Sequence, residues 1–274
     1  AEAKKVLSRE DVKAIIKTIA FYDKRALNIK NLLLESVKEV SPKSDAAKQA
    51  LALMGQWDNV NLDANRDGFY DHPGSILFDR WWTKAIAATF GNVFDGYKNP
   101  LGLTAVQILS DRYLGYTLFY RALQGTTGMD YFHGQKGNIL YAALEDALAE
   151  LAQENPGKKI GDYRQKTMMD SFHPVTVLGY FLMQPITSTA GELPPFPRVD
   201  RGTENHIVTL LPGGVMGENI TAPGASGFIR ADGERNPHLS DQVQMFVDFT
   251  YKPMLFTEEQ VKAAAKSTQV VEWR

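Results

Sequence analysis

Cysteine is absent from the 274 residues of this chain. Without thiols the protein has no disulfide, no thiolate metal site and no cysteine nucleophile. A large excess of one charge is also missing, because the formal net charge at pH 7 is −2. That balance gives no electrostatic reason to expect a nucleic-acid partner. No apolar run approaches the roughly 18 residues that predict a membrane span.

The residues that are present fit an ordinary globular protein, with 44% hydrophobic and 23% charged side chains. The length allows one large domain or two small ones around a sizeable core. The start, Ala1 to Lys5, has neither an initiator methionine nor a signal-peptide pattern. We therefore expect a processed chain or a piece of a longer one.

Apolar residues recur at helical spacing through the first two-thirds of the chain. Ser8 can cap the first helix, Ser44 the third, and Asn138 the last. We expect helices over residues 8–19, 27–40, 44–57, 75–90, 104–123 and 138–153. The large aromatic side chains Trp81 and Trp82, like Trp57, are expected in the core.

The pattern changes after a proline-rich stretch at residues 185–197. Short β-like runs follow at 206–211 and 219–229, separated by the turn signal Pro212-Gly213-Gly214. Helical patterns return at 239–249 and 257–266, where Thr257 and Gln260 form a capping-box pair. We predict an α+β protein with a helical region over 1–184 and a strand-and-helix region over 185–274.

The clearest local motif is the D-x-N-x-D-G-x-x-D run in the polar loop after Trp57. Alternating oxygen side chains followed by glycine are how an EF-hand-type loop wraps calcium. The candidate ligands are Asp63, Asn65, Asp67, the carbonyl of Phe69, and Asp71. Gly74 stands where an EF-hand has a bidentate glutamate, so the loop is incomplete. The alternative is a tight polar turn whose side chains bind their own backbone.

A partial G-x-S-x-G motif surrounds Ser226, with His238 and Asp241 nearby in sequence. A hydrolase nucleophile elbow needs glycine at the fifth place, which Phe228 occupies here. A glycine-rich turn between closely packed backbones is the competing interpretation. The histidines at 72, 133, 173, 206 and 238 do not show the spacing of a helical zinc site.

Residues 201–256 resemble the C-terminal region of the penicillin acylase family. The matching segments are Arg201 to Asn205, Ala222 to Ile229, His238, Asp241-Gln242, Phe246, Phe249, Lys252-Pro253 and Phe256. Ala225 stands where the family often has glutamine. The earlier part, including Phe78 to Trp82, is similar in character but matches less specifically.

The resemblance implies an N-terminal nucleophile hydrolase, with an αββα assembly cut autocatalytically from a precursor. It implies periplasmic or secreted location, a small acyl-amide substrate such as a penicillin, and no cofactor needed for the chemistry. In that family a β-chain N-terminal serine attacks the amide and its own amine is the base. Because Ala1 has no hydroxyl, we expect no catalytic residue in this chain and interpret it as the later part of the β chain. Its expected partners are the α chain and the earlier half of the β chain.

Three interpretations follow. The chain is a structural part of an amidase, a calcium-dependent binding module, or an independent serine hydrolase using Ser226. The family-like string of motifs favours the first, and the incomplete elbow disfavours the third.

Overall fold

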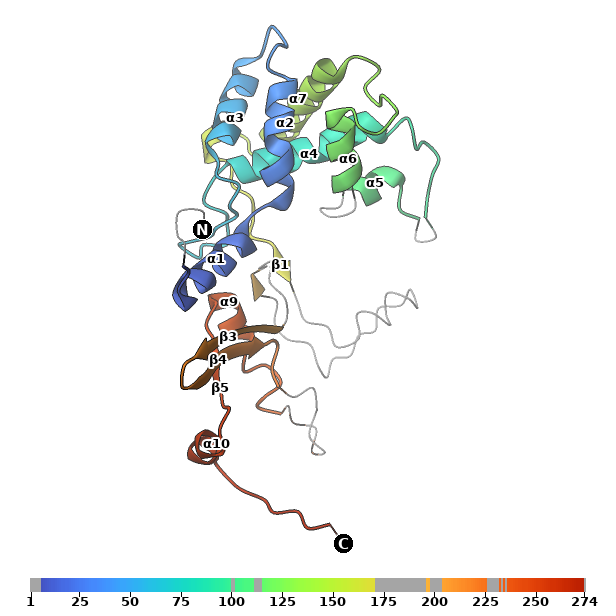
Figure 1. Cartoon of the computed structure of the whole chain (residues 1–274). Helices are drawn as coiled ribbons and strands as arrows, with labels where there is room; N and C mark the ends of the chain where they lie inside the picture. The colour runs from blue at the N-terminus through green and yellow to red at the C-terminus, as the bar shows by residue number, and fades with distance from the viewer. Residues whose placement is uncertain are drawn as a thin grey trace. The chain divides into compact units, whose positions relative to one another are not determined.

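The computed structural model describes residues 6–99, 102–110, 115–170, 196–197, 204–225, 232, 234 and 236–273. The chain divides into two units, one of residues 21–167 and one of residues 1–20 with 168–274. We call them the helical unit and the sheet unit (Figure 1). The expected boundary at residue 184 falls outside the described residues and stays a prediction.

The helical unit contains one π-helix, η1, six α-helices and one short 3-10 helix, η2, in its described part. Their bounds are η1 Ala26–Lys30, α2 Asn31–Ser36, α3 Asp45–Gln56, α4 Gly74–Phe90, α5 Ala105–Ser110, α6 Tyr116–Gln124, α7 Lys136–Glu154 and η2 Ile160–Asp162.

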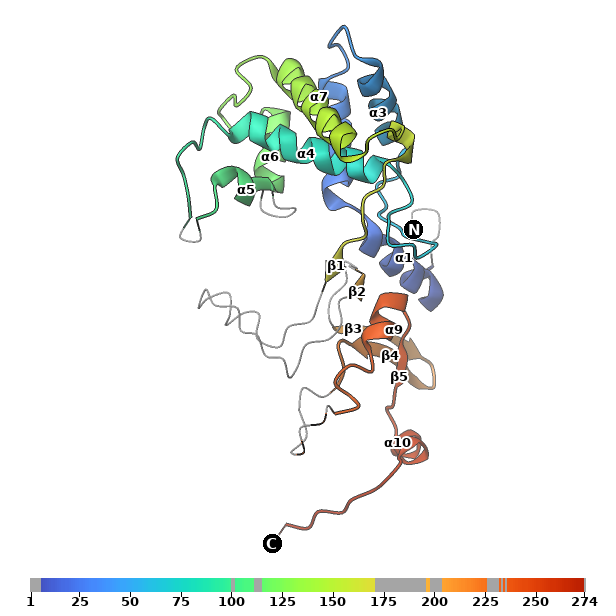
Figure 2. The ribbon, with the colours of Figure 1, turned by 180° about the vertical axis from the view of Figure 1, so that it is seen from behind.

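Helix α4 is the centre of this unit, packed against α3, α5 and α7 (Figure 2). Trp81 and Trp82 of α4 are fully buried, and Trp57 is nearly so, which confirms them as core residues. Each indole N–H still has a partner, because Trp81 donates to the carbonyl of Leu140 at 2.8 Å and Trp82 to that of Ser110 at 3.0 Å. The core therefore buries large aromatic area without leaving these donors unpaired.

A buried ion cluster lies beside this core. The Arg25 guanidinium is 2.7 Å from Asp23 and 2.7 Å from Asp79, and it stacks near the rings of Phe78 and Trp82. Burial alone would lower the pKa of Arg25, but the two carboxylates more than offset this and raise it. The cluster ties the segment before η1 to α4.

The sheet unit is built on a small antiparallel sheet in the order β3-β4-β5. The described elements are α1 Arg9–Phe21, whose last residue falls in the helical unit, β1 Met169–Asp170, β2 Phe196–Pro197, β3 Glu204–Leu211, β4 Gly214–Thr221, α9 Val243–Asp248, β5 Lys252–Met254 and α10 Glu258–Ala264. Strands β3 and β4 form a hairpin in which Leu211 pairs with Gly214. The two residues between them are the Pro-Gly of the expected turn.

Helix α1 is fastened to β4 by charge. Lys13 Nζ lies 2.7 Å from Glu218 Oε2, and Arg9 Nε lies 3.4 Å from the same oxygen. The Lys13 ammonium is also 5.3 Å from the centre of the Tyr251 ring. The hydrogen bond to Glu218 raises the pKa of Lys13, as expected for an amine held by a carboxylate.

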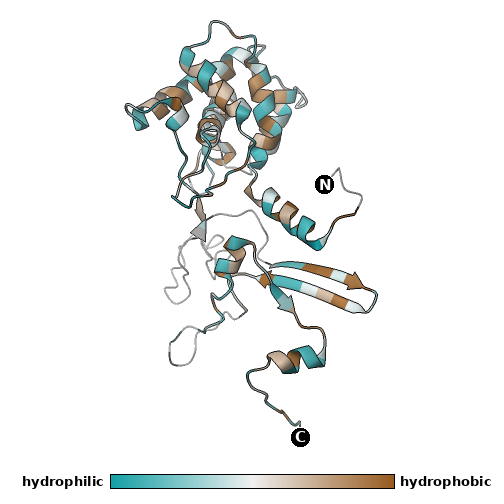
Figure 3. Ribbon diagram, turned by 90° about the vertical axis from the view of Figure 1, so that its left-hand side faces the viewer, coloured by the Kyte–Doolittle hydropathy of each residue, from teal (hydrophilic) through white to brown (hydrophobic). Residues whose placement is uncertain are grey.

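The β3–β4 hairpin contains several apolar residues, which are the brown segments of its strands in Figure 3. Leu210 is 81% exposed, and Val208, Leu211, Val215 and Met216 are also exposed.

Among the described residues, no helix is both long and apolar enough to cross a membrane.

Most expected helices are confirmed, including the Ser44 cap, which accepts the Ala47 N–H at 3.0 Å, and the Thr257 capping box. The single helix over 104–123 is wrong, because α5 and α6 are separate and Gly115 precedes α6. A Cβ on Gly115 would meet the Leu109 carbonyl oxygen at 1.7 Å, so the turn requires this close approach. The helix over 239–249 begins later than expected, at Val243.

Asn138 as the cap of α7 is also wrong, since the helix begins at Lys136 without a side-chain cap. Gly137 lies against α2, where a Cβ would meet the Ser36 carbonyl oxygen at 2.8 Å. The first turn of α7 is therefore packed against α2 and has no side-chain cap.

The strand expected over 206–211 is confirmed as β3, while the strand over 219–229 is corrected to β4 at 214–221. Position 217 within β4 requires glycine. A larger side chain there would collide with Met254 and Phe256, each of which has an atom 2.9 Å from the ideal Cβ position. Pro223 has no N–H to continue the ladder. Residues 226–229 lie outside the described residues. Strand β5 had no sequence prediction.

Candidate functional site

The polar loop after Trp57 is organised around the carboxylate of Asp63. Its Oδ1 accepts the Asp67 N–H at 3.0 Å, and its Oδ2 accepts the Gly68 N–H at 3.0 Å. The Thr167 hydroxyl donates to Oδ2 as well, also at 3.0 Å. Gly68, the glycine of the motif, has φ of 88°, a left-handed conformation that gives the loop a sharp turn.

The other expected ligands bind their own loop. Asn65 Oδ1 accepts the Asp67 N–H at 3.1 Å, and its amide donates to Asp67 Oδ2 at 2.9 Å. Asp67 Oδ1 accepts the Phe69 N–H at 2.9 Å. Asp71 Oδ2 accepts the Ala64 N–H at 3.2 Å. Each carboxylate therefore has a backbone partner, which is the arrangement of a tight polar turn.

The loop is held from outside by residues that sequence inspection missed. Tyr70 N–H donates to the Gln165 carbonyl and Thr167 N–H to the Gly68 carbonyl, both at 2.8 Å. Thr167 is 104 residues from Asp63 in sequence, so local motif spacing gave no signal for it. Among the described residues, no group of three or more His, Asp or Glu side chains is arranged to hold a metal ion. Calcium binding by this loop stays a prediction.

Next to the loop lies a buried amine, Lys30, that sequence inspection also missed. Its Nζ donates to the Trp57 carbonyl and lies 5.6 Å from the centre of the Trp57 ring. Burial lowers the pKa of Lys30. Lys30 stands three and seven residues before the buried Leu33 and Val37, so a lysine on an apolar helix face was the available signal.

The motifs that carry the family resemblance meet in the sheet unit. The Gln242 side-chain carbonyl accepts the Thr221 N–H at 2.9 Å, and the Gln242 N–H donates to the Pro223 carbonyl at 3.0 Å. Gly224 lies so close to the next motif that an added Cβ would be 2.1 Å from the His238 carbonyl oxygen. We call Thr221, Pro223, Gly224, His238, Asp241 and Gln242 the Gln242 cluster.

His238 of this cluster is oriented by a carboxylate, since its Nδ1 lies 2.7 Å from Asp241 Oδ2. The imidazole side chain is 65% exposed. An Asp-oriented imidazole is a general base when a nucleophile lies within hydrogen-bond reach. Ser226 lies outside the described residues, and no described serine or threonine hydroxyl is hydrogen-bonded to His238.

The remaining histidines do not gather into a site. The His72 Nδ1 accepts the Gly74 N–H at 2.9 Å, which makes it part of the start of α4. His133 lies in a turn with φ of 49°. His173 lies outside the described residues. Within the described ranges, the geometry offers a polar loop and a motif cluster but no assembled nucleophile and base.

A family model described as penicillin amidase matches residues 1–263. Penicillin G acylase of Escherichia coli is 27% identical over 266 residues, which cover 89% of this chain and 31% of that protein.

A solved structure, a thermostable penicillin G acylase from Alcaligenes faecalis, aligns with a TM-score of 0.76 at 21% identity. The alignment covers 100% of this chain and 51% of the solved one. At that identity the likeness is one of fold, and it confirms the expected α+β class as part of an acylase fold. The chain thus spans about a third of one relative and half of the other.

Proposed function

The chain belongs to the penicillin amidase family, and on that premise we propose that it is the later portion of an amidohydrolase that cleaves the amide bond of an acylated small molecule. The observation that carries the proposal is the family match over residues 1–263. The nucleophile, in this proposal, lies in polypeptide outside these 274 residues.

The share of the relative that this chain covers supports a nucleophile in other polypeptide. The chain accounts for 31% of the curated relative's length, so most of a comparable protein is not represented in it. Among the described residues, which do not include Ser226, no serine or threonine hydroxyl is hydrogen-bonded to a histidine. An activated hydroxyl nucleophile requires such a base, or its own terminal amine.

The sheet unit supports a polypeptide partner. Strand β3 lies at the edge of the three-stranded sheet and has one neighbour, β4, among the described strands. Its hairpin exposes Leu210, Leu211 and Val215. An open strand edge with exposed apolar side chains favours pairing with further polypeptide. The proposed partner is the remaining part of an acylase precursor, its α chain and the earlier half of its β chain.

The substrate is proposed by class. The relatives are named for penicillin G acylase activity, and an acyl amide of that general kind is the proposed substrate here. Periplasmic or secreted location is proposed on the same family grounds.

Calcium binding is proposed separately, for the loop of Asp63, Asn65, Asp67, Phe69 and Asp71. The D-x-N-x-D-G order supports it, although the described side chains do not converge as a ready-made ion site. The chemistry proposed above does not depend on it. Isothermal titration with calcium, using Asp63→Asn as the control, should show heat only in the parent chain. Equal heat in both would remove the loop as the site.

The function is tested by assaying the chain alone and the chain co-expressed with its upstream half. Penicillin G, p-nitroanilide amides and acyl-homoserine lactones form the substrate panel. We expect hydrolysis of at least one amide by the co-expressed pair and none by the chain alone. Hydrolysis by the chain alone, abolished in Ser226→Ala, would instead support the independent serine hydrolase.

A further inference from the structure

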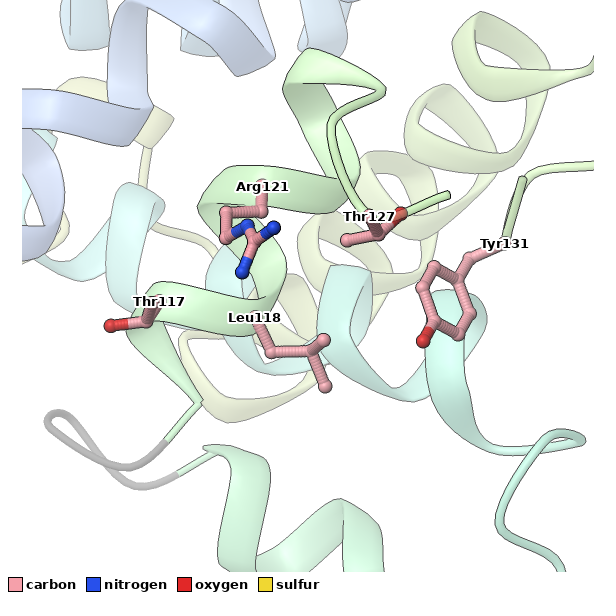
Figure 4. A pocket seen from close by; sticks show the side chains of 5 residues that line it. All are labelled: Thr117, Leu118, Arg121, Thr127 and Tyr131. Atoms are coloured by element: carbon pink, nitrogen blue, oxygen red, sulfur yellow. The ribbon is translucent and has the colours of Figure 1, made fainter. Parts of the chain in front are cut away.

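A cavity of about 350 Å³ opens beside α6 in the helical unit. Thr117, Leu118, Arg121, Thr127 and Tyr131 line it (Figure 4). Its volume is at the lower end of the range for sites that bind small organic molecules. The lining combines one cation, several hydroxyls and apolar surface, which is the composition of a selective site rather than of a purely apolar hollow.

The cavity forms because the chain folds back where α6 ends. Gly125 adopts a left-handed conformation with φ of 70°, which terminates the helix. The Thr126 N–H then donates to the Arg121 carbonyl at 3.0 Å. The segment that follows places Thr127 and Tyr131 across from the α6 side chains (Figure 4). The opposite walls are therefore adjacent in sequence and fixed by one turn.

Neighbouring residues fix the position of Tyr131, which forms one wall of the cavity. Its ring packs edge-on against Phe90, with ring centres 5.0 Å apart. Next to it, the Asp130 carboxylate accepts N–H groups of Phe132 at 2.9 Å and Gly134 at 2.7 Å. These backbone hydrogen bonds lower the pKa of Asp130. The acidic residue nearest to the cavity wall in sequence is thus engaged with its own turn.

Arg121 supplies a positive charge that the described residues do not neutralise. Its Nη2 donates to the Thr126 carbonyl at 3.1 Å. Arg25 and Arg80 each pair with two carboxylates, but no carboxylate in the described ranges forms an ion pair with Arg121. The guanidinium carries five N–H donors, so one backbone contact orients it and leaves donors for an anion.

We propose that this cavity binds a small organic monocarboxylate, with the carboxylate on Arg121 and the apolar body against Leu118 and the Tyr131 ring. A guanidinium matches the two oxygens of a carboxylate in a bidentate pair. The Tyr131 hydroxyl adds a neutral donor at the same space. The inference does not rest on the amide hydrolysis proposed above, because no catalytic group is part of it.

Titration of the full chain with three probes tests the proposal, using benzoate, its neutral analogue benzyl alcohol, and inorganic phosphate. Benzoate is expected to bind about tenfold or more tightly than either of the others, because it alone satisfies both the charge and the apolar wall. Arg121→Gln should weaken benzoate binding by about tenfold. Arg164→Gln is the matched control, since Arg164 is also exposed and donates to backbone carbonyls, those of Gly161 and Tyr163.

Tyr131→Phe provides a second variant that keeps the ring against Phe90, and it should weaken benzoate by about threefold. This variant decides the outcome if near-ultraviolet circular dichroism shows that Arg121→Gln does not fold. Equal binding of benzoate and benzyl alcohol, equal binding of phosphate, or benzoate binding unchanged by the folded variants would each overturn the proposal.

Discussion

The side-chain carbonyl of Gln242 accepts the backbone N–H of Thr221 at 2.9 Å, across 21 residues of sequence. Gln242 is buried, and Thr221 is the last residue of β4. One hydrogen bond therefore joins the end of a strand to the segment that starts α9. Two of the segments that carry the family resemblance also meet here, because the Gln242 N–H donates to the Pro223 carbonyl.

Replacing Gln242 by leucine should loosen this joint. The half-buried Thr221 N–H would lose its acceptor, at a cost of about 1 kcal/mol. Amide hydrogen exchange over β4 should become faster by a corresponding amount. Gln244→Leu is the control, because Gln244 is exposed and bonds only Asp248 among the described residues. Equal exchange in the two variants would show that the bond does not stabilise β4.

Replacing Gly224 by alanine should destabilise the sheet unit. Alanine there would place a Cβ 2.1 Å from the His238 carbonyl oxygen, so the backbone must move, at a cost of about 2 kcal/mol. Gly213→Ala in the hairpin turn meets nothing within 4 Å and should change stability by less than about 0.5 kcal/mol. Urea denaturation followed by tyrosine and backbone signals of the sheet unit compares them. Similar stability of the two variants would contradict the close approach.

Glu218→Gln should release α1 from β4. The carboxylate holds Lys13 and Arg9 and is largely shielded from solvent, so its loss should cost about 1 kcal/mol. Hydrogen exchange in α1 is the measurement. Glu10→Gln is the control, because Glu10 contacts the same two cations from a side chain that is 69% exposed. A larger effect at Glu10 than at Glu218 would reverse the expected order.

His72 should make the helical unit less stable in acid. Burial lowers its pKa below the usual 6.5, with the positive charges of Arg164 and Lys30 adding to the effect and Asp58 opposing it. As pH falls through about 6.5, the unfolded chain binds a proton that the folded chain resists, so stability decreases. The decrease ends once pH passes below the folded pKa.

Urea denaturation at about pH 7.5 and about pH 5 measures this effect. His72→Asn keeps an acceptor for the Gly74 N–H but does not titrate. The parent chain should lose more stability than the variant between the two pH values. An equal loss in both would mean that another group dominates the acid sensitivity.

Sequence patterns predicted the parts of the fold that depend on neighbours along the chain. The Ser44 and Thr257 caps are satisfied within three residues, so composition and spacing suffice for them. The break before α6 was not predicted, because the close approach of Gly115 to the Leu109 carbonyl, six residues earlier, exists only once the chain has turned. Strand β5 likewise depends on pairing with β4, 33 residues away in the Asn219–Lys252 pair.

The site residues divide in the same way. The oxygen-rich loop was visible in sequence, but Thr167, which fastens Asp63, comes from 104 residues away. Lys30 was not recognised from the sequence, because it lies within a helical pattern of apolar residues. A charged residue in such a pattern is easily taken for an exposed position. The sequence did not indicate that Arg121 lines a cavity without an ion-pair partner among the described residues. That arrangement depends on the turn at Gly125, which folds the chain back after α6.

In the proposed function, the amide-cleaving nucleophile lies outside these 274 residues. The most direct test treats the co-expressed, active pair with a serine-reactive sulfonyl fluoride until hydrolysis stops, and then measures the mass of each chain. We expect the sulfonyl adduct on the upstream polypeptide, while this chain keeps its unmodified mass. An adduct on this chain at Ser226, formed in step with the loss of activity, would contradict it.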